Sequence, residues 1–273
     1  MWTDTTRAHH ARKGLALPSD LTDNEWAVLK PCFPPPCHVG RPRKWPMRRI
    51  IEALLYLLRG GLPWRMLPSG FPPATTVQRW FYRWRDDGTW QRINHYLLQD
   101  ARIAQGCEAS PSAGVIDSQS VKTTESGGIR GYDAGKKVKG RKRHIITDTN
   151  GFLVHAVIHA ADIQDRDGAP LVLADIRSSF PWLRHIFADG GYAGEKLRLA
   201  LARIGAWSLE IIKRSDTAKG FVLLPRRWVV ERTFAWLNRN RRLAKDFENT
   251  IASATAWLFM ASVQLLTRRI ARP

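Results

Sequence analysis

The stretch GVIDSQSV, residues 114–121, places Asp117 in the middle of a short segment with the alternating pattern of a β-strand. Two more strands are predicted at RHIITD, residues 143–148, and FLVHAVIHA, residues 152–160. The Asn150-Gly151 pair between them is a hairpin signal. An antiparallel arrangement of the three strands is the most economical.

The chain after these strands alternates between helical and strand patterns. Residues 165–176 predict a helix, HIFAD at 185–189 a strand that ends in Asp189, 193–205 a helix and 207–213 a last strand. This order resembles that of the ribonuclease H-like fold, an α/β fold in which the first and fourth strands lie adjacent at the centre of a mixed sheet. Asp117 and Asp189 would then be neighbours.

Two adjacent carboxylates are hard oxygen ligands that attract Mg²⁺. Two metal ions about 4 Å apart can stabilise the attacking and leaving oxygens of a phosphodiester displacement. A third carboxylate is expected from Glu231. A basic helix is predicted over 228–244, and continued helical spacing from 227 to 242 places four residues on one polar stripe: Arg227, Glu231, Asn238 and Arg242. Glu231 could instead form an i, i+4 ion pair with Arg227. Arg227 and Arg232 lie near enough to bind a flanking phosphate.

The composition favours a nucleic-acid partner. The 273 residues hold 43 Lys and Arg against 24 Asp and Glu, a formal net charge of +19, which indicates a polyanionic partner. No apolar run reaches the roughly 18 residues of a spanning helix, so no membrane association is expected, and 251–266 predicts a buried helix. Three cysteines and no cleavable leader indicate a reducing cytoplasm, where such a protein would lie with the bacterial nucleoid.

The N-terminal part predicts a small helical module. Residues 1–18 are interpreted as a flexible basic tail, 19–105 as a helix-turn-helix-like DNA-binding module, 106–113 as a linker and 114–273 as the catalytic domain. A Thr22/Glu25 capping box opens the first helix, 47–59 is a core helix, and Thr75 or Thr76 would cap a recognition helix over 76–85. The candidate DNA contacts here are Arg41, Arg43 and Lys44 on a proline-rich arm, and Arg79 and Arg83 on that helix. In the alternative interpretation, the tryptophans of this helix are core and its arginines are merely solvated.

A basic run precedes the second strand. Lys136, Lys137, Lys139, Arg141, Lys142 and Arg143 crowd into eight positions. Such a run is usually a solvated loop, but its place before a strand of the active sheet favours contact with the DNA backbone, through Lys137, Lys139, Arg141 and Lys142. The acids Asp162, Asp165 and Asp167 lie at a helix start, where they complement the helix dipole.

Four strings carry a resemblance to a known family: VIDSQSVKTT, GRKRHIITDTNGFLV, FADGGYAGEKL and WVVERTFAWLNRNRRLAKDFE. They resemble the catalytic motifs of DDE-type bacterial insertion-sequence transposases of the insertion-sequence-five group, and LTDNEW, GRPRKW, LPWRMLP and FPPATTVQRWFYRW resemble that group's N-terminal module. The resemblance covers residues 19–248. Leu224 and Asn238 stand where the group's third-acid signature has Tyr and Lys.

The resemblance implies that Asp117, Asp189 and Glu231 are the catalytic acids and hold two Mg²⁺ ions, with Mn²⁺ as a substitute. It implies cleavage at the terminal inverted repeats of an element and strand transfer into target DNA by a homodimer or higher oligomer. Two alternatives stay open. One is a structure-selective nuclease or resolvase of the same fold, and the other is a sequence-specific DNA-binding protein without catalysis.

Overall fold

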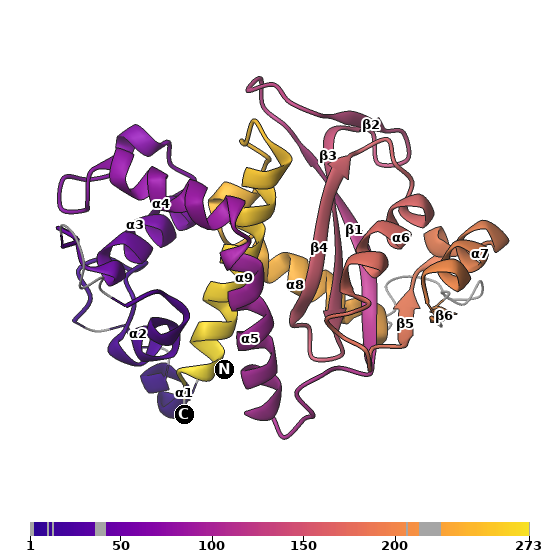
Figure 1. Ribbon diagram of the computed structural model, residues 1–273, viewed down its shortest axis with the longest axis horizontal. Helices are drawn as coiled ribbons and strands as arrows, with labels where there is room; N and C mark the ends of the chain where they lie inside the picture. Colours follow the sequence, from indigo (N-terminus) through magenta and orange to yellow (C-terminus); the bar gives the residue numbers. More distant parts are fainter. Residues whose placement is uncertain are drawn as a thin grey trace.

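A computed structural model describes residues 3–9, 11–12, 14–35, 42–205, 207–212 and 225–272. A helical part and a sheet part lie side by side, and the C-terminal helix α9 (Ile251–Ile270) runs between them (Figure 1). Helix α9 packs on α2, α3, α4 and α5 of the helical part and on β4 of the sheet. Both parts therefore share one apolar core, to which α9 contributes side chains on most of its surface.

The helical part contains α1 (Asp4–His9), α2 (Asp23–Leu29), α3 (Met47–Gly60), α4 (Ala74–Asp86) and α5 (Thr89–Ile103), with short 3₁₀ turns at Lys30–Cys32 and Trp64–Met66. The predicted capping box is confirmed, since Thr22 and Glu25 exchange side-chain to backbone hydrogen bonds. Helix α3 ends at Gly61, whose φ of 67° is left-handed. Helix α4 begins one residue before Thr75, after Pro73, so the predicted threonine cap is wrong: proline fixes the extended entry to the helix instead.

The sheet is mixed and follows the predicted order. Its strands are β1 (Ala113–Lys122), β2 (Gly131–Asp133), β3 (Val138–Asp148), β4 (Leu153–Ala160), β5 (His185–Ala188) and β6 (Ser208–Ile211). Strands lie in the order β2-β3-β1-β5-β6, and β4 also pairs with β3. The pairs β1–β3 and β3–β4 are antiparallel, whereas β1–β5 and β5–β6 are parallel. The first and fourth of the predicted strands are β1 and β5, because the short β2 was not predicted. Their predicted adjacency is confirmed, and the ribonuclease H-like mixed sheet with it.

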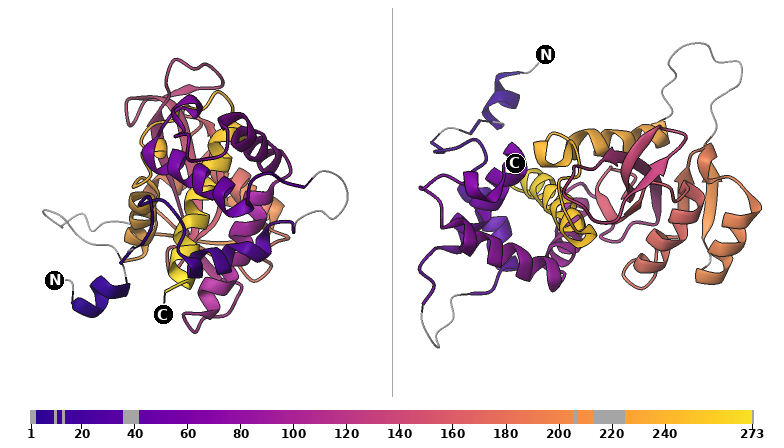
Figure 2. Two further views of the ribbon diagram at one scale, coloured as in Figure 1. Left: turned by 90° about the vertical axis from the view of Figure 1, so that its left-hand side faces the viewer. Right: turned by 90° about the horizontal axis from the view of Figure 1, so that it is seen from above.

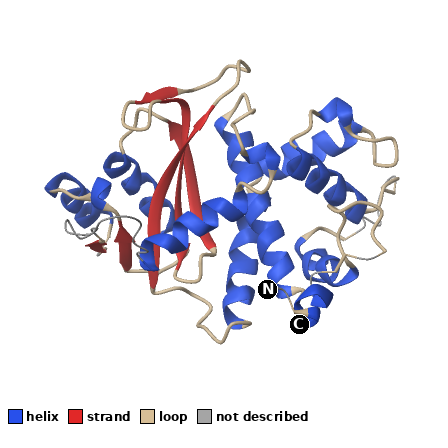
Figure 3. Cartoon of the chain, turned by 180° about the vertical axis from the view of Figure 1, so that it is seen from behind, coloured by secondary structure: helices blue, strands red, loops and turns tan. Residues whose placement is uncertain are grey.

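Helices cover both faces of the sheet. Helix α6 (Asp165–Ile176) packs on β1, β3 and β4 and contacts α7 (Glu195–Ile204), while α8 (Pro225–Leu237) packs on β1, β3 and β5. Seen from above, α8 lies on the face opposite to α6 and α7 (Figure 2). From behind, α8 crosses in front of the strands (Figure 3). Since both faces are covered, the central strands are buried.

The predicted long basic helix is wrong in its extent. Helix α8 ends at Leu237, and a separate 3₁₀ turn follows at Arg241–Leu243, so Asn238 and Arg242 do not continue the stripe of Glu231. The Arg242 side chain instead donates to the carbonyl of Leu62 at 2.8 Å and stacks on aromatic rings of the helical part. The Asn-Arg-Asn segment at 238–240 has low helix propensity, which agrees with the end of the helix at Leu237.

None of the described helices is long and apolar enough to cross a membrane. The prediction that 251–266 forms a buried helix is confirmed, since Trp257 of α9 is 1% exposed and stacks on Phe81 with ring centroids 4.4 Å apart. The aromatic pair joins α9 to α4.

Candidate active site

Asp117 and Asp189 are brought together by strand register. Val115 of β1 is paired with Phe187 of β5 in a parallel ladder. Asp117 comes two positions after Val115, and Asp189 comes two positions after Phe187. Asp189 is the residue directly after β5, which ends at Ala188. Asp117 lies in the middle of β1, level with the point where β5 ends, and because adjacent strands lie about 4.8 Å apart the two residues are neighbours across the sheet.

The Asp117 carboxyl is half-buried in an acidic environment. Its pKa is raised from 3.8 to about 7, mainly by loss of solvation and also by the nearby charges of Asp189 and Asp165, against the opposing effects of the Ser118 backbone N–H and of Lys136. That N–H donates to Asp117 Oδ1 at 2.7 Å. A carboxyl that is costly to ionise alone gains most from a nearby cation.

Asp189 is held by the turn that follows β5. Its Oδ1 accepts a hydrogen bond of 2.8 Å from the backbone N–H of Gly191, at the start of a 3₁₀ turn over Gly190–Tyr192. A Cβ on Gly191 would lie 3.1 Å from Asp189 Oδ1 and 3.7 Å from Asp165 Oδ2. The absence of a side chain at Gly191 therefore keeps open the space between these carboxylates.

Glu231 approaches this pair from α8 through an arginine. Nη2 of Arg227 lies 3.7 Å from Asp189 Oδ2 and 3.5 Å from Glu231 Oε1. The i, i+4 ion pair is thus present, and the same guanidinium also connects Glu231 to the strand acids. Among the described residues, no group of three His, Cys, Asp or Glu side chains is close enough to hold a metal ion. A cationic side chain occupies the space between two of the three predicted ligands.

Asp165 is a fourth acid at the site, although its sequence context favours a role at a helix start over a catalytic one. It does begin α6, but its Oδ1 also accepts from Ser118 Oγ at 2.6 Å and from Lys142 Nζ at 2.9 Å. Ser118 directly follows Asp117. No local signal distinguishes Asp165 from Asp162 or Asp167, because only the packing of α6 against β1 and β3 selects it.

A buried pair of aromatic side chains supports the site from behind. Tyr192 Oη lies 2.8 Å from His144 Nε2, and His144 Nδ1 lies 3.4 Å from His159 Nε2. Burial lowers the pKa of His144 to about 3, with His159 adding to the shift, so the ring is neutral. Neither Tyr192 nor His144 is exposed to a ligand, which agrees with a packing role.

The predicted DNA contacts of the helical part lie on the surface. Arg79 and Arg83 are exposed on one side of α4, and the Arg83 guanidinium lies 5.4 Å from the ring centre of Trp80. Trp84 is only 2% exposed, so the core interpretation holds for this tryptophan. On the arm, Lys44 is exposed and Arg43 partly exposed, whereas Arg41 lies outside the described residues.

The basic run is divided by burial. Lys137 and Lys139 are exposed, but Arg141 is 0% and Lys142 4% exposed. Arg141 forms an ion pair with Asp246, and Lys142 binds Asp165. The predicted contact of Arg141 and Lys142 with DNA is therefore wrong for this conformation: β3 is a central strand covered on both faces, so its cations are paired inside the protein.

Arg232 differs from Arg227 although both lie on α8. Its guanidinium stacks between Trp228 and Trp236, 4.5 Å from each ring, and Nη2 donates to the Asn150 carbonyl at 2.7 Å. Arg232 borders a pocket that also contains Arg226 and Arg269. It faces the β3–β4 turn rather than the acids, so only Arg227 of the two joins the acidic cluster.

Two family models match the chain, and together with the fold they define its class. The model described as "Transposase DDE domain" matches residues 108–266, which include the whole sheet, α8 and most of α9. The model described as "Putative transposase of IS4/5 family" matches residues 21–94, in the helical part. The chain belongs to the transposase DDE domain family. Its N-terminal part places it with the IS4/5 transposases, in rough agreement with the predicted insertion-sequence-five group.

Two of the curated relatives are named after one insertion element, IS402. The chain is 36% identical over 116 residues, 40% of its length and 54% of the relative's, to "Putative transposase for insertion sequence element IS402" from Burkholderia cepacia. It is 30% identical over 113 residues, 39% of its length and 76% of the relative's, to "Insertion element IS402 uncharacterized 16.2 kDa protein" of the same organism. The chain thus spans about half the length of the first relative. No solved structure matches it significantly.

Proposed function

We propose that this protein is a DNA transposase that binds the terminal inverted repeats of an insertion sequence, cuts at their ends and joins them to target DNA. The observation that supports this most is that Asp189 and Glu231 both lie within 3.7 Å of one Arg227 nitrogen, while Asp117 lies on the strand next to Asp189. Hard carboxylate oxygens in such a cluster suit Mg²⁺, with Mn²⁺ as a substitute.

The donor set fits a divalent cation by its chemistry. Asp117 and Asp189 would hold the ions on the strand side and Glu231 on the helix side. When bound, they would activate water and neutralise charge on the scissile phosphate. Arg227 would then be free to bind the phosphate through charge-assisted hydrogen bonds. The contacts among Ser118, Lys142 and Asp165 would keep the part of β1 around Asp117 in place.

A strand-transfer assay tests this function. A duplex that ends in labelled terminal repeats is incubated with the protein, plasmid DNA and Mg²⁺. We expect release of a 3′ hydroxyl end and its covalent joining to the plasmid. Because two ends must be joined, we also expect a dimer or higher oligomer on the DNA.

Two outcomes would replace the proposal. Cleavage of branched DNA without joining would favour a nuclease or resolvase of the same fold, and sequence-specific binding without cleavage would favour a DNA-binding protein. In this last case the carboxylates would have to be inert although all three are present.

A further inference from the structure

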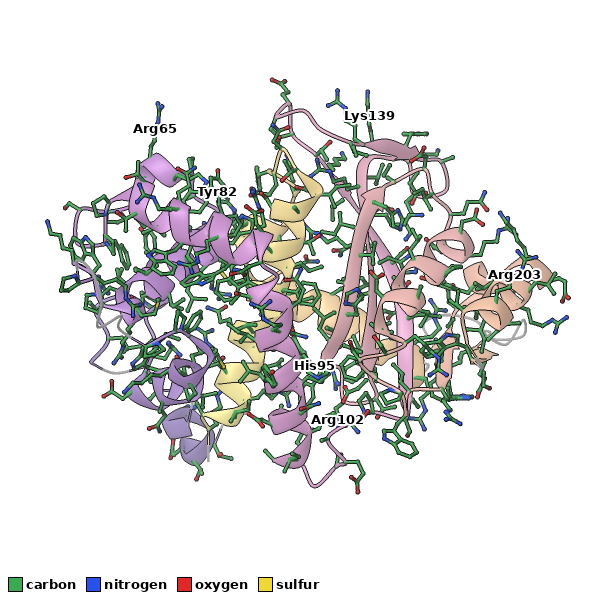
Figure 4. The ribbon with its side chains drawn as sticks, viewed as in Figure 1. Arg65, Tyr82, His95, Arg102, Lys139 and Arg203 are labelled. Carbon is green, nitrogen blue, oxygen red and sulfur yellow. The ribbon has the colours of Figure 1, made fainter. Side chains whose placement is uncertain are left out.

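A basic groove lies at the far end of the sheet, away from the acids. It is formed by the end of β1, the loop that follows, β2, the start of β3 and the loop before α9. Its cations are Lys122, Arg130, Lys137, Lys139 and Lys245, and it contains one acid, Glu125. Figure 4 shows Lys139 at this end of the sheet, directed away from the protein.

The cations of the groove are exposed and unpaired. All five side chains are exposed, and none forms an ion pair with another residue in the described part of the chain. Arg141 and Lys142 of the same sheet behave differently, since both are buried in ion pairs. Free cations gathered in one concave surface favour a polyanion.

The walls of the groove are fixed before any ligand binds. Backbone hydrogen bonds join Asp246 N to Lys122 O at 2.9 Å and Thr124 N to Asp246 O at 3.2 Å. Beneath them, the Arg141 guanidinium donates to the carbonyls of Ile129, Glu248 and Asn249 at 2.8, 2.8 and 3.0 Å. A rigid, prearranged surface loses little conformational entropy on binding.

The distance between groove and acids is set by β1. Lys122 is the last residue of this strand, and Gly140 pairs with it, so Lys139 lies beside the strand end. Lys122 comes five positions after Asp117, and at the strand rise of about 3.3 Å per residue the two Cα atoms are roughly 17 Å apart. Phosphates on one strand of duplex DNA lie about 3.4 Å apart along the axis, so this distance corresponds to about five nucleotides.

We infer that the groove binds the phosphate backbone of the same duplex whose scissile phosphate lies at Asp117 and Asp189, about five nucleotides from the cut. This inference rests on the proposed function for the position of the cut, but not for the binding of DNA. The groove would fix the register of the duplex, and the acids would carry out the chemistry. Exposed Tyr132 at its edge adds a hydroxyl that can contact the backbone.

Two matched double variants test the inference. Lys122→Gln with Lys139→Gln removes two groove charges, and Arg184→Gln with Arg203→Gln removes two exposed, unpaired charges elsewhere among the described residues, with Arg203 on α7 (Figure 4). DNA affinity is measured against salt concentration without metal. With about 0.9 counterion released per phosphate contact, the slope should fall by about 1.8 in the groove variant and stay unchanged in the control.

The position of the contact is tested with neutral phosphates. Single methylphosphonates are placed along the duplex, and we expect those about five nucleotides from the cut to weaken binding of the wild-type protein but not of the groove variant. Equal slope losses in both variants, or additive effects of methylphosphonate and variant, would overturn the inference even if cleavage is normal. Absence of cleavage by the wild-type protein would overturn the proposed function instead, and the salt slopes would still decide whether the groove binds DNA.

Discussion

The acidic site and the basic groove lie on the same strand, β1, but handle charge in opposite ways. At the acids, most charges have an opposing group: Arg227 lies between Asp189 and Glu231, and Lys142 binds Asp165. In the groove, the cations have no acidic partner among the described residues. The difference agrees with the two proposals made above, in which a metal replaces an internal cation at the first region and an external anion binds at the second.

Loss of a carboxylate should have the largest effect. Asp189→Ala removes the ligand that connects the strand pair to Glu231, so we expect DNA cleavage to fall by at least about a thousandfold. Binding of the terminal-repeat duplex should remain, because the groove and α4 are unchanged. Gel-based cleavage and binding assays on the same preparation measure both. Cleavage at the wild-type rate would show that the acids are not the catalytic group.

Removal of the cation beneath the groove should affect folding rather than binding. Arg141→Met leaves Asp246, which is 2% exposed, without its ion-pair partner and three carbonyls without a donor. Breaking a buried pair in this way costs about 3–5 kcal/mol of unfolding free energy. Lys139→Met on the surface should change it by less than about 0.5 kcal/mol. Urea unfolding compares the two, and equal stabilities would contradict the distinction.

These two neighbouring cations also show what the sequence could not predict. The local patterns of 114–121 and 185–189 predict two strands, and the resemblance of the whole strand and helix order to the ribonuclease H-like fold predicts β1 beside β5, and hence Asp117 beside Asp189. The run KKVKGRKR has no periodicity that marks where β3 begins, and its cations were therefore assigned together to DNA. Only the pairing of β3 with both β1 and β4, under helices on two faces, buries its second half.

For the acids too, local sequence pattern predicts part of the structure and long-range packing decides the rest. Glu231 was predicted from its helix pattern, but the end of α8 at Leu237 and the contact of Arg242 with the helical part, which is remote in sequence, were not. Asp165 was assigned to a helix start, and its position at the site follows from the packing of α6. Local pattern thus predicts elements and their order, whereas long-range packing decides which charged side chains meet.

The raised pKa of Asp117 predicts a pH-dependent cost of folding without metal. Since the folded-state pKa is about 7 instead of 3.8, the folded protein loses stability as the pH rises through this interval. At pH 8 in EDTA, Asp117→Asn should therefore be more stable than the wild-type protein by about 2–4 kcal/mol. At pH 4 the difference should disappear. Urea unfolding at the two pH values measures it, and a less stable variant at pH 8 would exclude a buried, costly carboxylate.

Replacement of Arg227 should have the smallest effect of these changes, and it should strengthen metal binding instead of weakening it. Its guanidinium competes with a metal for Asp189 and Glu231, so Arg227→Ala should bind Mn²⁺ about tenfold more tightly, as expected for a partly exposed charge near two carboxylates. Cleavage should nevertheless fall, because the same group is available to the phosphate once the metal has displaced it.

Arg232→Ala is the matched control for this change, because Arg232 lies on the same helix but stacks between Trp228 and Trp236. Calorimetric titration of Mn²⁺ without DNA should give wild-type affinity for this variant. If Arg227→Ala bound Mn²⁺ more weakly, Arg227 would have to orient the acids rather than compete for them. The acidic site would then be preformed, like the groove, and the contrast between the two regions would be one of charge alone.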